Sequence, residues 1–152
     1  MVNSRNIFDL DPAVRDVCNK QIALCRSAGI EIIITSTWRD FEAQAALYAI
    51  GRTTNKDRHT VTKARAGYSW HNFKAAWDVV PVIGGKPLWD SKHSIWREVV
   101  AFGKQAGAEA GADWKSFPDL PHFQFIPTKD GKKITLAQAR DLFAASGTVF
   151  SV

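Results

Sequence analysis

The stretch SWHNFKAAWDVV, residues 69–80, sets an imidazole and a carboxylate seven positions apart among bulky apolar side chains. Its second half continues as AAWDVVPV, residues 75–82, and such a β-branched and aromatic run predicts a buried strand. Asp78, next to Trp77 and two valines, needs a partner once it is buried, because an unpaired buried charge is costly. His71 and Asp78 are therefore either ordinary polar residues at the edge of a core or residues held there for chemistry.

Helical and strand patterns alternate along the rest of the chain. Asp11 followed by proline is typical of a helix start, and apolar residues then recur at helical spacing. The run IEIIITS is β-branched and follows a glycine, and HFQFI alternates polar with aromatic residues, so both predict strands. The expected elements are helices over 12–28, 40–51, 91–106 and 135–147 and strands over 30–36, 75–82 and 122–126, with Ser91 and Thr135 as the caps of the third and fourth helices.

Residues 52–68, RTTNKDRHTVTKARAGY, have no period and are polar and basic, which predicts a long loop of the kind that often carries function. No internal repeat, low-complexity tract or linker divides the chain. We therefore predict one α+β domain over residues 1–152, in which a small antiparallel sheet packs with helices and the helix at 135–147 packs on the remainder.

The composition is that of a globular domain, since 45% of the 152 residues are hydrophobic and 23% are charged. No apolar run approaches the roughly 20 residues that span a bilayer. The N-terminus lacks a secretion-signal pattern, so we expect a cytosolic product without stable membrane insertion. Cys18 and Cys25 lie seven apart in one predicted helix, too far apart for a disulfide, and are expected to be reduced core residues.

The excess of basic over acidic residues indicates which classes of partner the chain could bind. Lys and Arg number 20 and Asp and Glu number 15, which gives a net charge of +5. Such a balance suits an anionic partner such as nucleic acid, lipid headgroups or a bacterial wall, and it equally serves to keep a small protein soluble. Neither a basic helix nor an aromatic-plus-basic strand is present, so nucleic acid is not an expected partner.

Two of the four histidines stand at the edges of predicted strands beside acids. His71 precedes the strand that contains Asp78, and His122 opens another strand, with Asp119 three residues earlier. Two neutral imidazoles and one carboxylate form a common catalytic zinc set. A separate carboxylate is then needed to move the proton of the attacking water. Asp119 lies between two prolines that stiffen its turn, although an aspartate there can also simply cap a turn.

Spacing alone leaves plainer interpretations open. A lone His122 beside aromatic residues is more often a hydrogen-bonded core residue than a ligand, and Asp78 could stand at an exposed strand edge. The sequence has neither an H-E-x-x-H helix nor paired C-x-x-C motifs, so the generic metal signal is weak.

Several segments, however, resemble one enzyme family. SWHNFKAAWD resembles the S-x-H-x-x-G-x-A-x-D signature of the zinc D,D-peptidase and L-alanyl-D-glutamate peptidase family. DLPHFQF resembles the second signature of that family, an acid followed three residues later by the last histidine ligand. ITSTWRDFEAQAALYAIGR (34–52) and GADWKSFPDLPHFQ (111–124) are similar to the opening and closing segments of bacteriophage endolysins in the family. The resemblance covers about residues 5–127 and implies the hedgehog/D,D-peptidase fold.

The resemblance implies roles for individual residues. His71, Asp78 and His122 would hold one Zn²⁺ ion, and Asp119 would act as general base and then as general acid. Arg39 matches the arginine of the family that follows the first strand, and its cationic fork suits a substrate carboxylate or a developing oxyanion. The plainer alternative for Arg39 is a pair with one of the acids that follow it.

Three further positions have weaker assignments. Ser69 matches the serine that opens the first signature and is expected to hold a ligand or the substrate through a hydrogen bond, unless it merely caps a turn. Trp114 is the candidate substrate contact among the aromatic residues, because it lies just before the Asp119 loop. Lys74 stands where the family has glycine, which implies either an ordinary backbone or a strained one at that position.

The expected function is that of a zinc metallopeptidase that cuts peptidoglycan stem peptides, most often between L-Ala and D-Glu in the endolysin subfamily. We expect a monomer without a separate wall-binding domain, waiting in the host cytoplasm until a phage holin opens the membrane. The alternatives are a D-Ala-D-Ala carboxypeptidase or dipeptidase with the same ligands, and a zinc-bearing wall-binding module that has lost catalysis. A nucleic-acid binder is suggested by charge alone.

Overall fold

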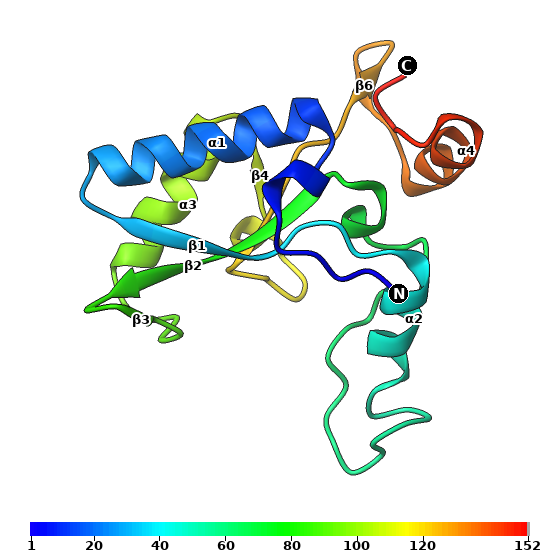
Figure 1. The fold of residues 1–152 in the computed structure, drawn as a ribbon, viewed down its shortest axis with the longest axis horizontal. Coiled ribbons are helices and arrows are strands. Elements are labelled where there is room, and N and C mark those ends of the chain that lie inside the picture. The colour runs from blue at the N-terminus through cyan, green and yellow to red at the C-terminus, as the bar shows by residue number, and fades with distance from the viewer. Residues whose placement is uncertain (152) are drawn as a thin grey trace.

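A five-stranded antiparallel sheet forms the centre of the molecule in the computed structural model, which describes residues 1–151 (Figure 1). The strands lie in the order β1-β2-β5-β4, and β3 pairs with the far end of β2. Every pairing is antiparallel, which confirms the predicted α+β class. The strands are β1 (Glu31–Ser36), β2 (Ala76–Ile83), β3 (Lys86–Pro87), β4 (Glu109–Ala110) and β5 (His122–Gln124).

The helices begin where the sequence provides side-chain caps. Asp11 accepts a hydrogen bond from the Ala13 amide at the start of α1, and Asp40 accepts one from Ala43 at the start of α2. Thr135 forms a capping box with Gln138 at the start of α4. The helices are α1 (Pro12–Ser27), α2 (Phe41–Ala49), α3 (Ile95–Gln105) and α4 (Leu136–Ser146), with short 3-10 turns η1 (Ile7–Asp9), η2 (Trp70–Phe73) and η3 (Gly111–Asp113).

Side chains alternate along a strand, so one face of the sheet packs against helices while the other carries a different set of residues. Trp77 on β2 and Phe123 on β5 are register partners, and their fully buried rings stack with centroids 6.1 Å apart. Gln21 of α1 accepts a hydrogen bond from the Trp77 indole at 2.8 Å and donates one to the Val99 carbonyl of α3 at 3.2 Å. The helices α1 and α3 therefore cover this face, and the residues adjacent in sequence point to the other.

Three expected boundaries are wrong. The second helix was expected to reach residue 51, and α2 ends at Ala49. Ser91 does not cap α3; the helix begins four residues later, at Ile95, after a turn in which the Ile95 amide donates to Nδ1 of His93 at 3.1 Å. The strand expected over 122–126 ends at Gln124, although the Phe125 amide still donates to the Ala75 carbonyl at 3.0 Å. The paired two-residue strands β6 (Thr128–Lys129) and β7 (Lys132–Lys133) were not expected, since so short a strand carries no readable period.

The C-terminal helix α4 packs beside η2. Phe143 contacts Phe73, with ring centroids 5.6 Å apart, and Arg140 donates a hydrogen bond to the Gly67 carbonyl at 3.0 Å. Beyond the helix, Thr148 donates to the Asp11 carboxylate at 2.6 Å. The first two contacts join α4 to the segment around His71, and the third joins the chain after α4 to the start of α1.

Cys18 and Cys25 are both free thiols, completely buried in α1. Burial raises the pKa of Cys18 to about 12 and that of Cys25 to about 11, with Glu98 adding to the rise at Cys25. The thiolate is the reactive form, so both are inert core residues at neutral pH. Among residues 1–151, no helix has the length and apolar character that crossing a bilayer requires.

Candidate metal centre

Three side chains from separate segments meet on the sheet face that α1 and α3 leave free. Asp78 on β2 and His122 on β5 are register partners, and His71 comes from the η2 turn before β2. Oδ1 of Asp78 lies 3.2 Å from Nε2 of His71 and 3.4 Å from Nδ1 of His122. All three donor atoms lie within 4.8 Å of one another. The predicted His-Asp-His set therefore converges at one point.

The outer nitrogen of each imidazole is engaged by a fixed acceptor. Nδ1 of His71 lies 2.8 Å from the Thr37 carbonyl, which can only accept, so Nδ1 donates to it and Nε2 faces the cluster, where it is free to bind a metal ion. Nε2 of His122 lies 2.8 Å from Oε1 of Gln124, whose amide nitrogen donates to Glu109 at 2.8 Å. Such outer partners orient metal-binding histidines and set their tautomer.

The donor set fits a zinc ion. Zinc ligands lie about 2.0–2.2 Å from the metal, so ligands at tetrahedral angles lie about 3.3 Å apart. The observed separations of 3.2 and 3.4 Å agree with that value. Two imidazoles and one carboxylate also leave a fourth position for water or substrate, as catalytic zinc sites do.

The electrostatics of the cluster favour a cation at its centre. Burial raises the pKa of Asp78, but the neighbouring His71 and His122 outweigh it and hold that pKa well below its ordinary value. Burial lowers the pKa of His122, but the hydrogen bond and charge of Asp78 outweigh it and raise that pKa. The Asp78 carboxylate thus stays ionised and favours positive charge beside it, either on the neighbouring imidazoles or on a metal ion between the three donors.

The η2 turn sets the position of His71. Oγ of Ser69 accepts a hydrogen bond from the His71 amide at 3.3 Å, so Ser69 caps the turn rather than facing the three donors. Lys74, at the end of the turn, has a φ of 60°, the left-handed conformation that glycine adopts without steric cost. Of the two possibilities at this position, the structure shows the strained one. The Lys74 ammonium lies over the Trp38 ring, 4.4 Å from its centroid.

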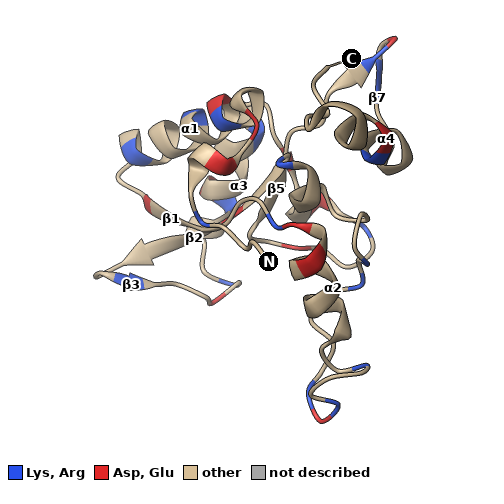
Figure 2. Cartoon of the chain, turned by 45° about the vertical axis from the view of Figure 1, so that its right-hand side comes forward, with Lys and Arg blue, Asp and Glu red and all other residues tan. Residues whose placement is uncertain are grey.

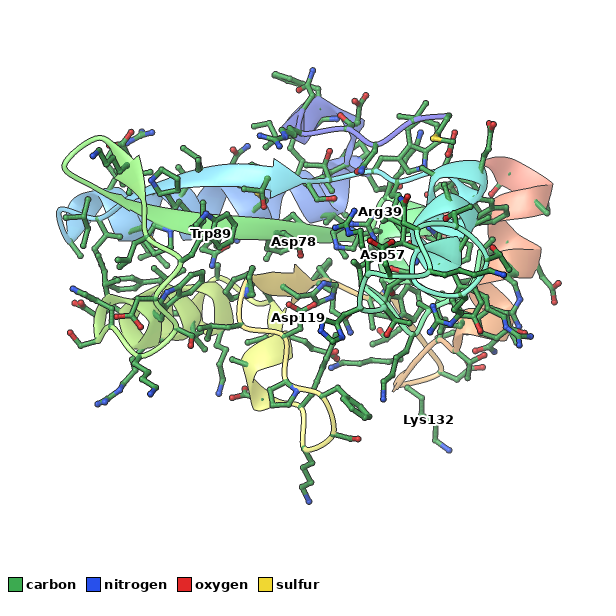
Figure 3. The ribbon with its side chains drawn as sticks, turned by 90° about the horizontal axis from the view of Figure 1, so that it is seen from below. Arg39, Asp57, Asp78, Trp89, Asp119 and Lys132 are labelled. Carbon is green, nitrogen blue, oxygen red and sulfur yellow. The ribbon has the colours of Figure 1, made fainter. Side chains whose placement is uncertain are left out.

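Asp119 lies at the open edge of the cluster, on the segment that leads into β5 (Figure 3). Its amide donates to the Gly111 carbonyl at 3.0 Å, and its carbonyl accepts from the His122 amide at 3.2 Å. Burial by the surrounding chain raises the pKa of the Asp119 carboxyl, and the negative charge of Asp78 adds to the rise. His122 counters both effects only in part. A carboxyl beside the cluster whose pKa is raised accepts a proton more readily than an ordinary aspartate and can return it.

Arg39 faces the same region from the segment after β1 (Figure 3). Its guanidinium donates to Gln44 at 3.1 Å and to Ser36 at 3.2 Å. Burial lowers its pKa, and the charges of Asp78 and Asp119 raise it. The neighbouring acids of Arg39 do not pair with it, because Asp40 and Glu42 pair with the N-terminal amine.

Trp114 lies across the mouth of the cluster. Its ring centroid is 5.0 Å from that of His122, at an angle of 47°, and the residue is 38% exposed. One face of the indole therefore rests on a donor residue and the remainder is open to solvent.

Sequence reasoning missed four residues that hold the site: Thr37, Gln44, Gly111 and Gln124. Only Gln124 had a readable signal, since it follows His122 by two residues in a strand and must share its face. Thr37 bonds to His71, 34 residues away, and Gln44 bonds to Ala64, 20 residues away, so no local pattern reveals them.

Gly111 permits the close approach of the Asp119 segment. A Cβ at Gly111 would lie 2.4 Å from the Asp119 carbonyl oxygen and 3.0 Å from Cβ of His122. We expect Gly111→Ala to lower the free energy of unfolding by about 1–3 kcal/mol, because the backbone must shift to relieve the overlap. Urea unfolding measures that loss. A wild-type free energy of unfolding in Gly111→Ala would contradict the close approach.

The family model and the relatives that match this chain are all described as peptidases or carboxypeptidases. The family model described as D-alanyl-D-alanine carboxypeptidase matches residues 62–125. The peptidoglycan L-alanyl-D-glutamate endopeptidase CwlK of Bacillus subtilis is 39% identical over 127 residues, covering 78% of this chain and 75% of that protein. The L-alanyl-D-glutamate peptidase of Listeria phage A118 is 31% identical over 121 residues, covering 79% of this chain and 39% of that longer protein.

Solved structures share the fold. The Serratia marcescens L-Ala D-Glu endopeptidase ChiX superposes with a TM-score of 0.59 at 20% identity, over 82% of this chain and 88% of that one. The vancomycin-resistance D,D-pentapeptidase VanY, solved in complex with Zn(II), superposes with a TM-score of 0.56 at 15% identity, over 93% and 81% of the two chains. At such identities the likeness concerns the fold.

Proposed function

Because this chain belongs to the family of D-alanyl-D-alanine carboxypeptidases and L-alanyl-D-glutamate peptidases, we propose that it is a zinc-dependent endopeptidase of peptidoglycan stem peptides. The bond we assign is L-Ala–D-Glu, which the names of the Bacillus and phage relatives state for those proteins. The observation that carries the proposal is the meeting of His71, Asp78 and His122, with Asp119 at the edge of the cluster.

We assign the metal to the three converging donors. Nε2 of His71, a carboxylate oxygen of Asp78 and Nδ1 of His122 would hold one zinc ion, with Thr37 and Gln124 fixing the two rings. When bound, zinc supplies Lewis acidity that polarises a carbonyl group and acidifies water.

The other residues move protons and place the substrate. Asp119 takes the proton of the attacking water and returns it to the leaving amine, a use that suits its raised pKa. Arg39 offers its guanidinium to a substrate carboxylate or to the oxygen that gains negative charge. Ser69 holds His71 through the backbone, and the exposed part of Trp114 offers an apolar wall to the peptide at the mouth.

We propose that residues 1–151 act together as one catalytic unit, because the contacts of α4 with η2 and of Thr148 with Asp11 tie the C-terminal segment to the site. A role in phage-mediated host lysis is part of the proposal and has its support in the phage relative. The partner we assign is peptidoglycan, and one copy of the chain supplies all three metal donors, which supports a monomer.

Product analysis tests the bond assignment. Purified peptidoglycan is digested with the enzyme, and the soluble muropeptides are weighed and their new termini labelled. We expect a new free α-amino group on D-Glu, together with L-Ala at the other new end. Release of terminal D-Ala without that amino group would replace the assignment by a D-Ala-D-Ala carboxypeptidase. Intact muropeptides with zinc bound would replace it by a binding module.

A further inference from the structure

The loop over residues 52–68, here the basic loop, carries nearly all the net charge of the chain. It contains five of the 20 cationic residues and one of the 15 acidic residues, so its own charge is +4 out of the total of +5. It projects from the end of α2 away from the body of the molecule (Figure 1), and its cations stand out along it (Figure 2). The cations are Arg52, Lys56, Arg58, Lys63 and Arg65.

None of these five cations pairs with a carboxylate among the described residues. Aromatic rings hold three of them instead. The Arg52 guanidinium lies 3.8 Å from the ring centroid of Tyr48, and Arg65 donates to the Tyr48 hydroxyl at 3.3 Å. Lys63 lies over the ring of Phe117. A ring face holds a cation without neutralising it, so the charges stay available to an anion.

The basic loop is anchored beside the metal centre. Gln44, which is fully buried, donates to the Ala64 carbonyl at 2.8 Å with its amide nitrogen and accepts from Arg39 at 3.1 Å with its amide oxygen. Across the mouth, the contact of Lys63 with Phe117 joins the loop to the segment that leads to Asp119. The loop thus borders the site at a fixed position while residues 53–61 stay exposed.

We propose that the basic loop is a docking surface for the carboxylates of peptidoglycan stem peptides that neighbour the peptide being cut. This inference rests on the proposed function. The loop offers repeated cations at one edge of the site, and a cross-linked wall offers repeated carboxylates around each scissile bond. Docking of this kind raises the local concentration of substrate and weakens as salt screens the charges.

Two other anionic partners fit the loop less well. A membrane surface favours several large apolar side chains beside the cations, and the basic loop offers two exposed ones, Val61 and Tyr68, against five cations. Single-stranded nucleic acid favours open aromatic faces for stacking, and a cation already lies over one face of each ring at this loop: Arg52 over Tyr48, Lys63 over Phe117 and Arg140 over Tyr68.

The test compares two triple variants that remove the same charge. The loop variant replaces exposed cations of the basic loop: Lys56→Gln, Arg58→Gln and Lys63→Gln. The control variant replaces exposed, unpaired cations elsewhere on the chain: Lys86→Gln, Lys129→Gln and Lys132→Gln. Both are made in the full chain with Asp119→Ala, so that cleavage does not disturb binding. Thermal unfolding establishes that both variants are folded.

Binding is measured by co-sedimentation with sacculi from which phosphate polymers have been removed. We expect the loop variant to bind about tenfold more weakly at low salt, since three exposed charge contacts together contribute about that factor, and to show a flatter salt dependence. The control variant should change by less than about twofold. Sacculi whose carboxylates have been amidated should bind the unsubstituted loop as weakly as native sacculi bind the loop variant.

Each contrary result has a single meaning. Equal binding by the loop variant, or an equal loss in the control variant, would overturn docking by the basic loop. Unchanged binding to amidated sacculi would overturn the choice of carboxylates. Because these measurements do not use cleavage, failure of the docking proposal is distinct from failure of the peptidase assignment, which product analysis decides alone.

Discussion

Asp119→Ala is expected to lower kcat/KM on purified peptidoglycan by about 10²–10⁴-fold, the range that general acid–base catalysis contributes, while the chain still binds one zinc ion. The reason is that Asp119 is not one of the three converging donors, yet its carboxyl stands at the edge of their cluster with a raised pKa. Its removal leaves the metal ligands in place and takes away the group that accepts the proton of water and delivers it to the leaving amine.

The measurement pairs initial rates of muropeptide release with metal content by mass spectrometry. Asp113→Ala is the matched control, because Asp113 is an acid on the same segment that pairs with Lys104 of α3 at 2.8 Å and does not face the cluster. The control should keep the wild-type rate. Wild-type activity in Asp119→Ala would move the proton acceptor elsewhere, and loss of the metal along with activity would make Asp119 a ligand.

Long elements with strong local signals could be predicted from the sequence. The proline after Asp11 predicted the start of α1, and the run around Trp77 predicted β2, because a short run rich in β-branched and aromatic residues favours a buried strand. The position of α3 was misjudged by four residues, since a serine can cap a helix only where the chain then turns, and here Asp90 and His93 organise the turn that follows Ser91.

The side chains that form the site could be predicted from the sequence, and the residues that hold those side chains in place could not. His71, Asp78, Asp119 and His122 lie in two short motifs, so their resemblance to a family could place them. Their supports are made across space: the Thr37 carbonyl, the buried amide of Gln44 and the missing side chain of Gly111 act on segments up to 34 residues away. Such roles depend on which segments meet, and one sequence read locally does not contain that information.

The backbone conformation of Lys74 is another feature that local sequence could not predict. The sequence left open whether a lysine in place of glycine would keep an ordinary backbone. The structure holds the left-handed conformation, because the chain must reverse between η2 and β2 to bring His71 and Asp78 to the same point. The Asp11 amide also donates to the Lys74 carbonyl at 3.0 Å, which fixes the turn from outside. The positions required of His71 and Asp78 thus outweigh the preference of Lys74 for an ordinary backbone conformation.

Asp78→Asn is expected to lower the affinity for zinc by more than about 100-fold and to abolish cleavage. Loss of an outer partner of a metal ligand already costs 10–100-fold, and this change removes the only negative charge among the three donors. The fold should persist, because the stacked Trp77 and Phe123 lie on the other face of the sheet. Competition with a chromophoric chelator measures the affinity.

Thermal unfolding separates this loss from a general weakening of the protein. A ligand that binds only the folded state raises stability by RT ln(1 + [L]/Kd), so added zinc should raise the Tm of the wild type and of Asp119→Ala. It should leave the Tm of Asp78→Asn nearly unchanged at the same zinc concentration. If zinc stabilised Asp78→Asn as much as the wild type, the ion would bind elsewhere on the chain. The convergence of Asp78 with the two imidazoles would then be an ordinary buried hydrogen-bond cluster, with no Lewis acid beside Asp119 and no basis for peptide hydrolysis at this face of the sheet.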